Sequence, residues 1–360
     1  MPLKIVHCAD LHIGASFSQL SSSLAAQRGE ELCDAFSNII NYCKEKSVDA
    51  LLICGDLFDC PKPSKKDCDF VKNALAALSP IPVFIICGNH DYMCPGSVFS
   101  RSNYFTNNVH IFPCFDYSFN LSEKNTVIYG KSYSGNVTEP TFDRCEFDKS
   151  KINIMCLHGD IALSSDYNVI SRETLSSLPC NYAAFGHIHN GECFLAGNIQ
   201  CAYSGTAEGH SFNDDGYTGF IYAEITPDET LITPVSLSKR HYHNISFDIS
   251  GHNNSSVTQE LKGLINNKDL YRITLTGEYT EEINVEYIKK ELEKVAFYID
   301  IFDNSTACYD FDAIEREESL RGEFLRELRK ISSGEEEFIC SAKAGLDALS
   351  GKIPGAEADI

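Results

Sequence analysis

Short runs of apolar residues alternate with polar segments along the first half of the chain. Five of them have the length and composition of buried strands, and they lie at Leu3–Ala9, Ala50–Cys54, Val83–Cys87, Ile152–Leu157 and Tyr182–Phe185. Helical spacing of apolar residues fills the segment 28–46, and a second helical pattern follows Ser64, a residue suited to cap a helix. This alternation of strands and helices predicts a layered α/β domain.

Shorter strand candidates lie between these runs and after them. They are separated by Gly, Asn and Asp turns, and their positions are Thr126–Tyr129, Phe194–Ala196, Ile199–Tyr203 and Gly219–Ile225. Short strands with frequent turns predict a second, antiparallel-rich sheet.

The pattern changes again beyond Pro234. Strands at Ile245–Ile249, Tyr271–Thr276 and Phe297–Phe302 alternate with helices at about 256–265 and 285–295, which indicates a compact α/β appendage. The stretch Phe311–Ile331 is helical and highly charged, and the last residues, GKIPGAEADI, are typical of a loose tail. We therefore expect a main domain over residues 1–240, a small α/β domain over 241–310 and a C-terminal segment over 311–360.

Length and composition place the chain among globular proteins. Its 360 residues, 43% of them hydrophobic, can bury a large core. The first residues lack the apolar core of a secretory signal, and no stretch of about 18 apolar residues occurs, so we expect a cytoplasmic protein without a membrane span. The 16 cysteines form no CxxC pair, which favours reduced thiols over disulfides or a zinc site.

The net charge limits the choice of partners. The chain has 30 basic and 51 acidic residues, a net charge of −21, and the acidic excess occurs both before and after residue 240. Nucleic-acid-binding proteins usually carry a basic stripe that neutralises phosphates. This surface alone should therefore repel DNA.

Polar clusters stand at the ends of the five apolar runs. They are Asp10-Leu11-His12, Gly55-Asp56-Leu57-Phe58-Asp59, Gly88-Asn89-His90-Asp91, His158-Gly159-Asp160 and Gly186-His187-Ile188-His189. Ligands of open α/β sheets bind at the carboxyl ends of the strands, so this shared position indicates one site. The glycines would let the backbone turn tightly beside it.

The side chains of these clusters are suited to metal ions. They offer oxygen and imidazole nitrogen without thiolate, as Mn²⁺, Fe²⁺ or Zn²⁺ prefer, and the candidate ligands are Asp10, His12, Asp56, Asn89, His158, His187 and His189. Seven ligands are too many for one ion, whereas two ions roughly 3.5–4 Å apart would accommodate them.

The seven candidates divide between two ions. We expect Asp10, His12 and His189 on one ion, Asn89, His158 and His187 on the other, and Asp56 as a bridge. Residues i and i+2 of an extended segment point the same way, so Asp10 could pair with His12, and His187 with His189.

His90 follows Asn89 directly, so its side chain should face the open side of the site instead of the ions. Water activated by the ions would attack a phosphorus atom in line, and the His90 imidazolium would protonate the departing oxygen. Asp91 and Asp160 are better explained as turn or supporting residues. The alternative for the whole set is a group of ordinary polar loops.

These motifs resemble those of the calcineurin-like metallophosphoesterases, whose pattern is D-x-H, G-D, G-N-H-[DE], H and G-H-x-H, over about residues 3–235. The spellings ADLHIG, GDLFD, GNHD and GHIH, followed by YSGTAEGHSFNDDGYTGF, are similar to the bacterial SbcD-type and YhaO-like DNA repair exonucleases. The resemblance implies a two-layer β-sandwich flanked by helices and a small α/β capping domain over 241–310. It also implies two Mn²⁺-type ions on the ligands above, and phosphodiester hydrolysis with His90 as the leaving-group acid.

The resemblance further implies DNA as the substrate and an SMC-like coiled-coil ATPase as partner, and a homodimer stays open. Asp59 could orient His90, although some members have His at that position. The basic group Lys62, Lys65 and Lys66 is the candidate contact for phosphate. His210, in a Gly- and Asn-rich loop, could reach the site, but an ordinary surface position is the simpler interpretation.

Three functions stay open at this point. The first is a metal-dependent exonuclease or endonuclease subunit of DNA repair, which the motif spellings favour. The second is a phosphodiesterase or phosphatase for small molecules, which the net charge favours. The third is a regulatory subunit that binds metal without turnover.

Overall fold

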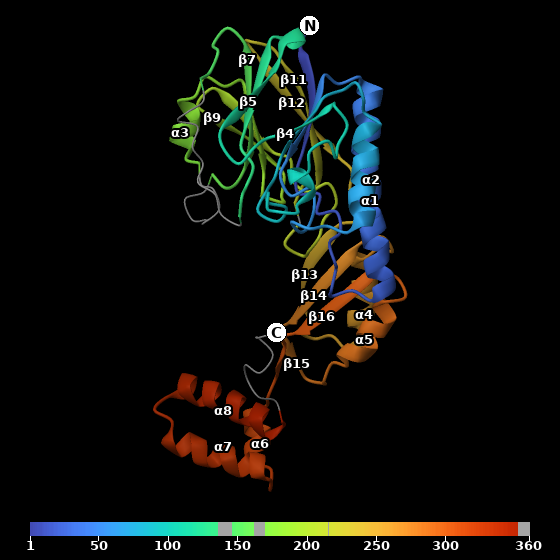
Figure 1. The fold of residues 1–360 in the computed structure, drawn as a ribbon. Coiled ribbons are helices and arrows are strands. Elements are labelled where there is room, and N and C mark those ends of the chain that lie inside the picture. Colours follow the sequence, from blue (N-terminus) through green and yellow to red (C-terminus); the bar gives the residue numbers. More distant parts are fainter. Residues whose placement is uncertain (136–145, 162–169, 215, 352–360) are drawn as a thin grey trace. The chain divides into compact units, whose positions relative to one another are not determined.

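The computed structural model describes residues 1–135, 146–161, 170–214 and 216–351 (Figure 1). The chain divides into two compact units, Met1–Tyr242 and His243–Ile360. The further division expected at residue 310 stays a prediction.

The first unit contains a six-stranded sheet built around the first three apolar runs. Its strand order is β12 (Thr230–Ser236), β11 (Gly219–Ile225), β1 (Leu3–Cys8), β2 (Ala50–Cys54), β3 (Val83–Ile86) and β4 (Val109–Ile111). The strands β1 to β4 are parallel, and β11 is antiparallel to both of its neighbours. The carboxyl ends of β1, β2 and β3 therefore meet at one edge.

A second sheet has the order β5 (Tyr117–Leu121), β6 (Thr126–Gly130), β7 (Ile152–His158), β8 (Tyr182–Gly186), β10 (Ile199–Tyr203) and β9 (Glu192–Ala196). Its four inner strands are parallel, and only the edge strands β5 and β9 are antiparallel to their neighbours. The prediction of an antiparallel-rich sheet was wrong, because two long buried runs, β7 and β8, belong to this sheet. Apolar periodicity identifies a strand but not its sheet or its direction.

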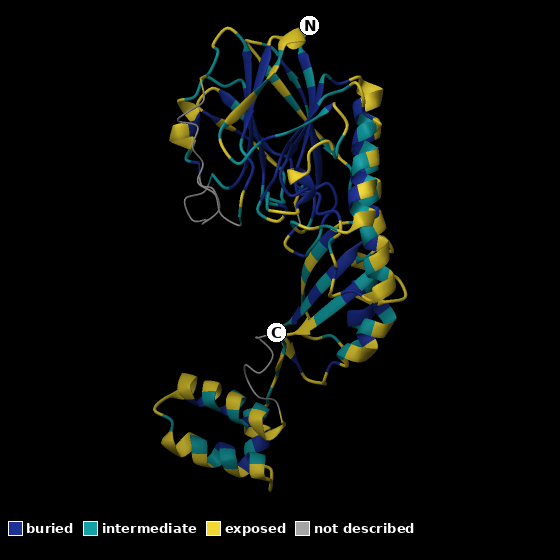
Figure 2. Cartoon of the chain, in the orientation of Figure 1, coloured by how far each residue is buried: buried dark blue, intermediate teal, exposed yellow. Residues whose placement is uncertain are grey.

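The two sheets pack face to face. One buried core joins side chains of both, among them Ile5 and Leu52 from the first sheet and Ile154 and Ala184 from the second. Helices α1 (Ser22–Lys46) and α2 (Lys65–Ala76) lie along the outer side of the first sheet, each with a buried face and an exposed face (Figure 2). The short helix α3 (Arg172–Ser176) packs on the second sheet. The expected sandwich flanked by helices is confirmed.

Local signals explain the helix boundaries of this unit. The Ser64 hydroxyl accepts a hydrogen bond from the backbone N–H of Asp67, so α2 begins where its predicted cap stands. Ser21 caps α1 in the same way, and α1 therefore begins at Ser22, before the predicted position. Two single turns of 3₁₀ helix, η1 (Val98–Ser100) and η2 (Ser122–Lys124), complete the unit.

The second unit begins with a three-stranded sheet of β13 (Tyr242–Asp248), β14 (Leu270–Thr276) and β16 (Tyr298–Asp303). Helices α4 (Asn254–Leu264) and α5 (Val285–Leu292) share an apolar core with it. The strands β15 (Glu278–Tyr279) and β17 (Thr306–Ala307) pair in parallel beside this sheet. The predicted order of strands and helices in this appendage is confirmed.

Three helices follow, α6 (Phe311–Glu315), α7 (Leu320–Ile331) and α8 (Glu335–Leu349), with a small core of their own. The single helix predicted over 311–331 was wrong, because Ser319 caps a new helix and Arg326 donates to the Glu317 carbonyl at the end of the old one. Helix α8 was not foreseen. The tail predicted after residue 350 lies, except for Gly351, outside the described residues.

Two further expectations concern the whole chain. All fifteen cysteines that the structure describes are free, and Cys8, Cys54, Cys87 and Cys156 are buried as packing residues. Among the described helices, none has the length and apolar character needed to cross a membrane.

Candidate metal centre

The polar clusters of both sheets come together at one edge of the sandwich. Backbone hydrogen bonds join the first two loops, from Asp10 N to the Gly55 carbonyl at 3.1 Å and from His12 N to the Asp56 carbonyl at 3.0 Å. The loop of Asn89 meets the loop of His158, because His158 Nε2 lies 2.9 Å from Asn89 Oδ1. The loop of His187 meets that of Asp10, because the backbone N–H of His187 donates to the Asp10 carboxylate.

The backbone at these positions is unusual. Four of these residues have positive φ angles, in the left-handed region that residues other than glycine rarely adopt. The values are 51° for Asp10, 43° for His12, 50° for Asp56 and 94° for His187. The extended geometry predicted for Asp10 to His12 and for His187 to His189 was therefore wrong. Strained backbone that the surrounding structure maintains is typical of functional sites.

The candidate ligands form two neighbouring groups. Donor atoms of Asp10, His12 and His189 lie within 4.8 Å of one another, the separation that one ion requires. Asn89 Oδ1 lies 2.9 Å from His158 Nε2 and 3.2 Å from His187 Nδ1, which brings the other three together. Two further groups cross this division, Asp10 with Asp56 and His158, and His12 with Asp56 and His90, so the assignment of ligands to two ions stays a prediction.

Asp56 lies between the two groups. Its Oδ2 is 3.9 Å from His12 Nε2 on one side and 3.3 Å from His158 Nε2 on the other. The position is that of a bridging ligand.

The imidazole rings are oriented for metal binding. Nδ1 of His12 lies 3.1 Å from Asp59 Oδ1, Nδ1 of His158 lies 2.8 Å from the Cys54 carbonyl, and Nδ1 of His189 lies 3.1 Å from Asp214 Oδ1. An oxygen acceptor at Nδ1 holds the proton there and leaves a lone pair on Nε2, as in metal-bound histidines. This donor set fits divalent ions such as Mn²⁺, Fe²⁺ or Zn²⁺.

The Nε2 atom of His12 indicates that the site needs a cation to satisfy all of its polar atoms. His12 Nε2 is buried and has no hydrogen-bond partner in the part of the chain that the structure describes. An unpaired buried polar atom costs roughly 1–3 kcal/mol. A cation held with Asp10 and His189 would remove that cost.

The charges of the site are strongly coupled. Burial alone would raise the pKa of Asp56, but the nearby His158 and His12 outweigh burial and lower the pKa below its usual value. This carboxylate therefore stays ionised. Burial lowers the pKa of His158, but Asp56 outweighs it and raises the value to about 9. Burial and the neighbouring His158 together lower the pKa of His187. In the absence of ions, protons on His158 therefore compensate the buried negative charge.

Asp91 has the supporting role expected of it. Its buried carboxylate accepts backbone N–H groups of Leu57, Phe58 and Gly88 and so ties the second loop to the third. Burial, followed by the nearby Asp56 charge, raises the pKa of Asp91 to about 7.

Gly88 is needed for space. A Cβ atom there would lie 2.2 Å from Asp56 Oδ1 and 2.7 Å from His158 Nε2, which no side chain can do without displacing both groups. The predicted role of a tight turn does not apply, since Gly88 has no positive φ angle. The backbone approaches the ligands closely instead.

His90 lies beside the ligand groups with its side chain 47% exposed. Its backbone N–H donates to Asp56 Oδ1, and its ring lies 4.7 Å from the ring of His12. Asp59 Oδ1 contacts His12 Nδ1 at 3.1 Å and is 3.9 Å from His90 Nδ1. Asp59 thus faces both a candidate ligand and the candidate acid.

The predicted phosphate contacts are not part of this cluster. Lys62, Lys65 and Lys66 are exposed around the start of α2. The side chain of Lys65 is 93% exposed and lies 3.9 Å from the Asp69 carboxylate. Their contact with phosphate stays a prediction.

The structure brings in two residues of one loop. His210 packs its ring 4.9 Å from His12 and 5.6 Å from His189, so the surface position weighed for it was wrong. Asp214, which accepts from His189, was missed because an aspartate within the sequence FNDDG looks like an ordinary turn residue.

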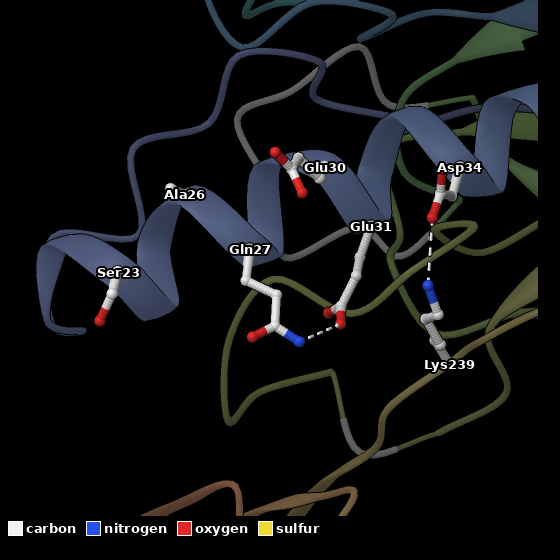
Figure 3. Close-up of a pocket in the computed structure, with 7 residues that line it drawn as sticks. All are labelled: Ser23, Ala26, Gln27, Glu30, Glu31, Asp34 and Lys239. Carbon is white, nitrogen blue, oxygen red and sulfur yellow. Dashed lines mark hydrogen bonds and ion pairs between the residues drawn. The ribbon is translucent and has the colours of Figure 1, made fainter.

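A cavity of about 420 Å³ lies elsewhere, beside α1 (Figure 3). It is lined by Glu30, Glu31 and Asp34, with Lys239 paired to Asp34 at 3.1 Å. None of the candidate metal ligands lines this cavity, so it is separate from the metal centre.

Comparisons with known proteins agree with this chemistry. A family model described as calcineurin-like phosphoesterase matches residues 3–191. The chain is also 27% identical over 239 residues to YhaO of Bacillus subtilis (strain 168), which is described as an uncharacterized metallophosphoesterase. That match covers 62% of this chain and 58% of YhaO, so the chain aligns with little more than half of this relative.

Solved structures give weaker likenesses. TT1561 of Thermus thermophilus is 9% identical with a TM-score of 0.42, over 65% of this chain and 99% of its own. A dimetal phosphatase from Danio rerio is 13% identical with a TM-score of 0.44, over 66% of this chain and 98% of its own. Neither reaches a TM-score of 0.5, so the assignment depends on the sequence match. The family model matches residues 3–191, which is more than half of the 360 residues. The protein therefore belongs to the calcineurin-like phosphoesterase family, whose members hydrolyse phosphate esters with divalent metal ions.

Proposed function

We propose that this phosphoesterase cleaves the phosphodiester bonds of DNA with two divalent ions, as the nuclease subunit of a DNA repair complex. The observation that carries the hydrolytic part is the position of Asp56 between two groups of ligands, with His90 exposed beside them. The motif spellings shared with DNA repair exonucleases support the choice of DNA.

The residues divide the chemistry among them. Ions bound by the seven ligands would polarise the phosphoryl oxygens and lower the pKa of a bound water to about 7. His90, which is half-exposed, would donate a proton to the leaving oxygen. Asp59 would orient His90 through Nδ1, which leaves Nε2 toward the substrate.

The acidic surface argues for a partner. With a net charge of −21, the chain would meet DNA against electrostatic repulsion. An SMC-like ATPase with a basic surface would supply the attraction, and the exposed Lys62, Lys65 and Lys66 would contact phosphates of the bound DNA. A homodimer would hold two such centres on one DNA, and we regard it as secondary to the ATPase.

The second candidate is a phosphodiesterase or phosphatase for small molecules. The same net charge favours it, since a small phosphoester needs only the ions and not an extended basic surface. The third, a regulatory subunit without turnover, requires His90 to be dispensable.

One assay separates the three. The purified chain is given Mn²⁺ with labelled duplex DNA, single-stranded DNA, bis(p-nitrophenyl) phosphate and cyclic nucleotides, alongside the His90→Asn variant. The proposal expects DNA cleavage that depends on Mn²⁺ and on His90. Rapid turnover of the small substrates with intact DNA would favour the second candidate, and inactivity on every substrate would favour the third.

A further inference from the structure

His210 is held in place by contacts from several parts of the first unit. Its backbone N–H donates to Asp214 Oδ2 at 2.7 Å, and its carbonyl accepts from the Tyr242 hydroxyl at 3.2 Å. The ring of Phe17 stacks on its imidazole at 6.3 Å with an angle of 13°. The orientation of the ring is therefore well determined.

The segment that carries His210 is anchored to α1. Arg28, fully buried, donates to Glu208 Oε1 at 2.8 Å and to the Gly209 carbonyl at 2.7 Å. Glu31 completes this buried ion network with Arg28 and with Arg240, whose Nη2 lies 2.8 Å from it. Such a network is costly to disrupt, because removing any one of its charged side chains would leave an opposite charge buried and unpaired.

The hydrogen bonds of Thr206 determine where the proton of His210 lies. Thr206 Oγ1 donates its one proton to a backbone carbonyl, that of Asp10 at 2.7 Å or of Glu208 at 3.0 Å. Toward His210 Nδ1, 3.1 Å away, the hydroxyl can then only accept. Nδ1 therefore carries the proton, and Nε2 carries a lone pair.

That lone pair has no partner among the described residues. His210 Nε2 is buried without a hydrogen bond, as is Nε2 of His12, and the His210 side chain is only 11% exposed. A lone pair accepts a proton or binds a cation, and it repels the oxygens of a phosphate. A neutral His210 in this tautomer cannot donate a proton from Nε2 to a substrate phosphate.

The three rings around this position are spaced as ligands of one ion. A nitrogen about 2.0–2.1 Å from an ion puts its ring centre about 3 Å away, so rings on one ion lie roughly 4.5–5.5 Å apart. The rings of His12 and His189 are 5.1 Å apart, and the ring of His210 is 4.9 Å from the first and 5.6 Å from the second. By donor-atom distance, His210 forms a group within 4.8 Å with His189 and Asp214, and Asp10 and His12 form theirs with His189, so His189 is the residue that the two groups share.

We propose that His210 is a further nitrogen ligand of the ion that Asp10, His12 and His189 would hold. The inference rests on the proposed two-ion site and makes it asymmetric. One ion would have three imidazoles, and the other would have two imidazoles and the Asn89 amide. Nitrogen-rich coordination suits Fe²⁺ or Zn²⁺ better than Mn²⁺ at that position.

Metal binding, and not activity, tests this assignment. The wild-type chain, His210→Phe and His210→Gln are freed of metal and titrated with Mn²⁺, and the free ion is measured by its electron paramagnetic resonance signal. His210→Phe keeps the ring that stacks on Phe17, whereas His210→Gln keeps a group that can bond to Thr206. The control is His252→Phe, a histidine of the second unit paired with Glu260. Circular dichroism checks that each variant is folded.

The expected result is two ions on the wild type and on the control. Both His210 variants should bind one ion unchanged and the other at least tenfold more weakly, since even outer partners of ligands contribute 10- to 100-fold. The absorption spectrum of the Co²⁺ form should change in the His210 variants alone. Unchanged affinities and an unchanged Co²⁺ spectrum in a folded His210 variant would overturn the assignment. A wild type that binds no ions would overturn the proposed function as well.

Discussion

Both imidazoles of the first ligand group, and that of His210 beside them, are oriented by an oxygen of the chain. Asp59 accepts from His12, Asp214 from His189 and Thr206 from His210, all at 3.1 Å between the paired atoms. His90 differs, because its side chain is half-exposed and its Nδ1 lies 3.9 Å from Asp59 Oδ1, farther than a hydrogen bond. The residues that would hold ions are thus rigid, and the residue that would transfer a proton is accessible.

This difference leads to a prediction for His90. The variant His90→Asn should bind the same number of ions as the wild type but hydrolyse bis(p-nitrophenyl) phosphate about 10²–10⁴-fold more slowly, the usual contribution of general acid catalysis. Steady-state kinetics and metal analysis of the same preparation measure both. A variant that loses its ions would instead identify His90 as a ligand.

A second prediction concerns the pair of His189 and Asp214. In the metal-free chain, burial lowers the pKa of His189, but the hydrogen bond to Asp214 outweighs it and raises the value to about 9. Burial raises the pKa of Asp214, but His189 lowers it to about 2. The unfolded values are about 6.5 and 3.9. The pair therefore stabilises the fold fully between about pH 4 and 6.5, and this stabilisation is lost as the pH rises through about 9 or falls through about 2.

Asp214→Asn should remove that stabilisation. Urea unfolding in the presence of a chelator should show the largest difference in unfolding free energy from the wild type between about pH 4 and 6.5, and a smaller one at pH 9. A difference that stays constant from pH 5 to 9 would contradict the ion pair. Asp214→Asn should also weaken metal binding about 10- to 100-fold.

At the scale of elements, the loops that end β1, β2 and β3 are tightly packed on one another. Asp91 accepts from the backbone of two of them, and Gly88 lies against the Asp56 carboxylate. The ligands of both sheets can meet because the backbone of these loops approaches the ligand side chains closely. Glycine is needed at such positions, because any side chain would occupy the space of a ligand.

Two glycine variants test this packing. Gly88→Ala should displace Asp56 and weaken metal binding, because its Cβ would lie 2.2 Å from Asp56 Oδ1. Gly29→Ala in α1 is the control, since nothing lies within 4 Å of its Cβ. That change should stabilise the fold by about 0.5–1 kcal/mol, the usual gain inside a helix. Calorimetry and Mn²⁺ titration of both variants measure the effects, and a Gly88→Ala chain with wild-type metal affinity would refute the steric account.

The same elements show how far sequence patterns lead. The apolar runs identify β1, β2, β3, β7 and β8 within about a residue, because burial determines them locally. Sheet membership depends on long-range pairing, so β7 and β8 could not be assigned to the second sheet. Asp214 and the inner position of His210 depend on the tertiary path of a loop whose composition is that of any turn.

At the scale of the whole molecule, the charge and the metal centre are connected. Burying Asp10, Asp56 and Asp91 close together is unfavourable without cations. The excess of acidic residues increases the repulsion among these carboxylates, and it also repels DNA from the chain. Divalent ions would reduce the repulsion at the metal centre, and a basic partner would reduce the repulsion of DNA.

The central claim is that distant loops of one chain hold two ions through a shared carboxylate. The most direct measurement is the number of Mn²⁺ ions bound per chain at equilibrium, for the wild type and for Asp56→Asn. We expect two ions on the wild type and a clear loss of binding in the variant, because Asp56 lies 3.9 Å from His12 Nε2 and 3.3 Å from His158 Nε2. A folded wild type that binds no ion, or a variant that binds two as tightly as the wild type, would contradict the account.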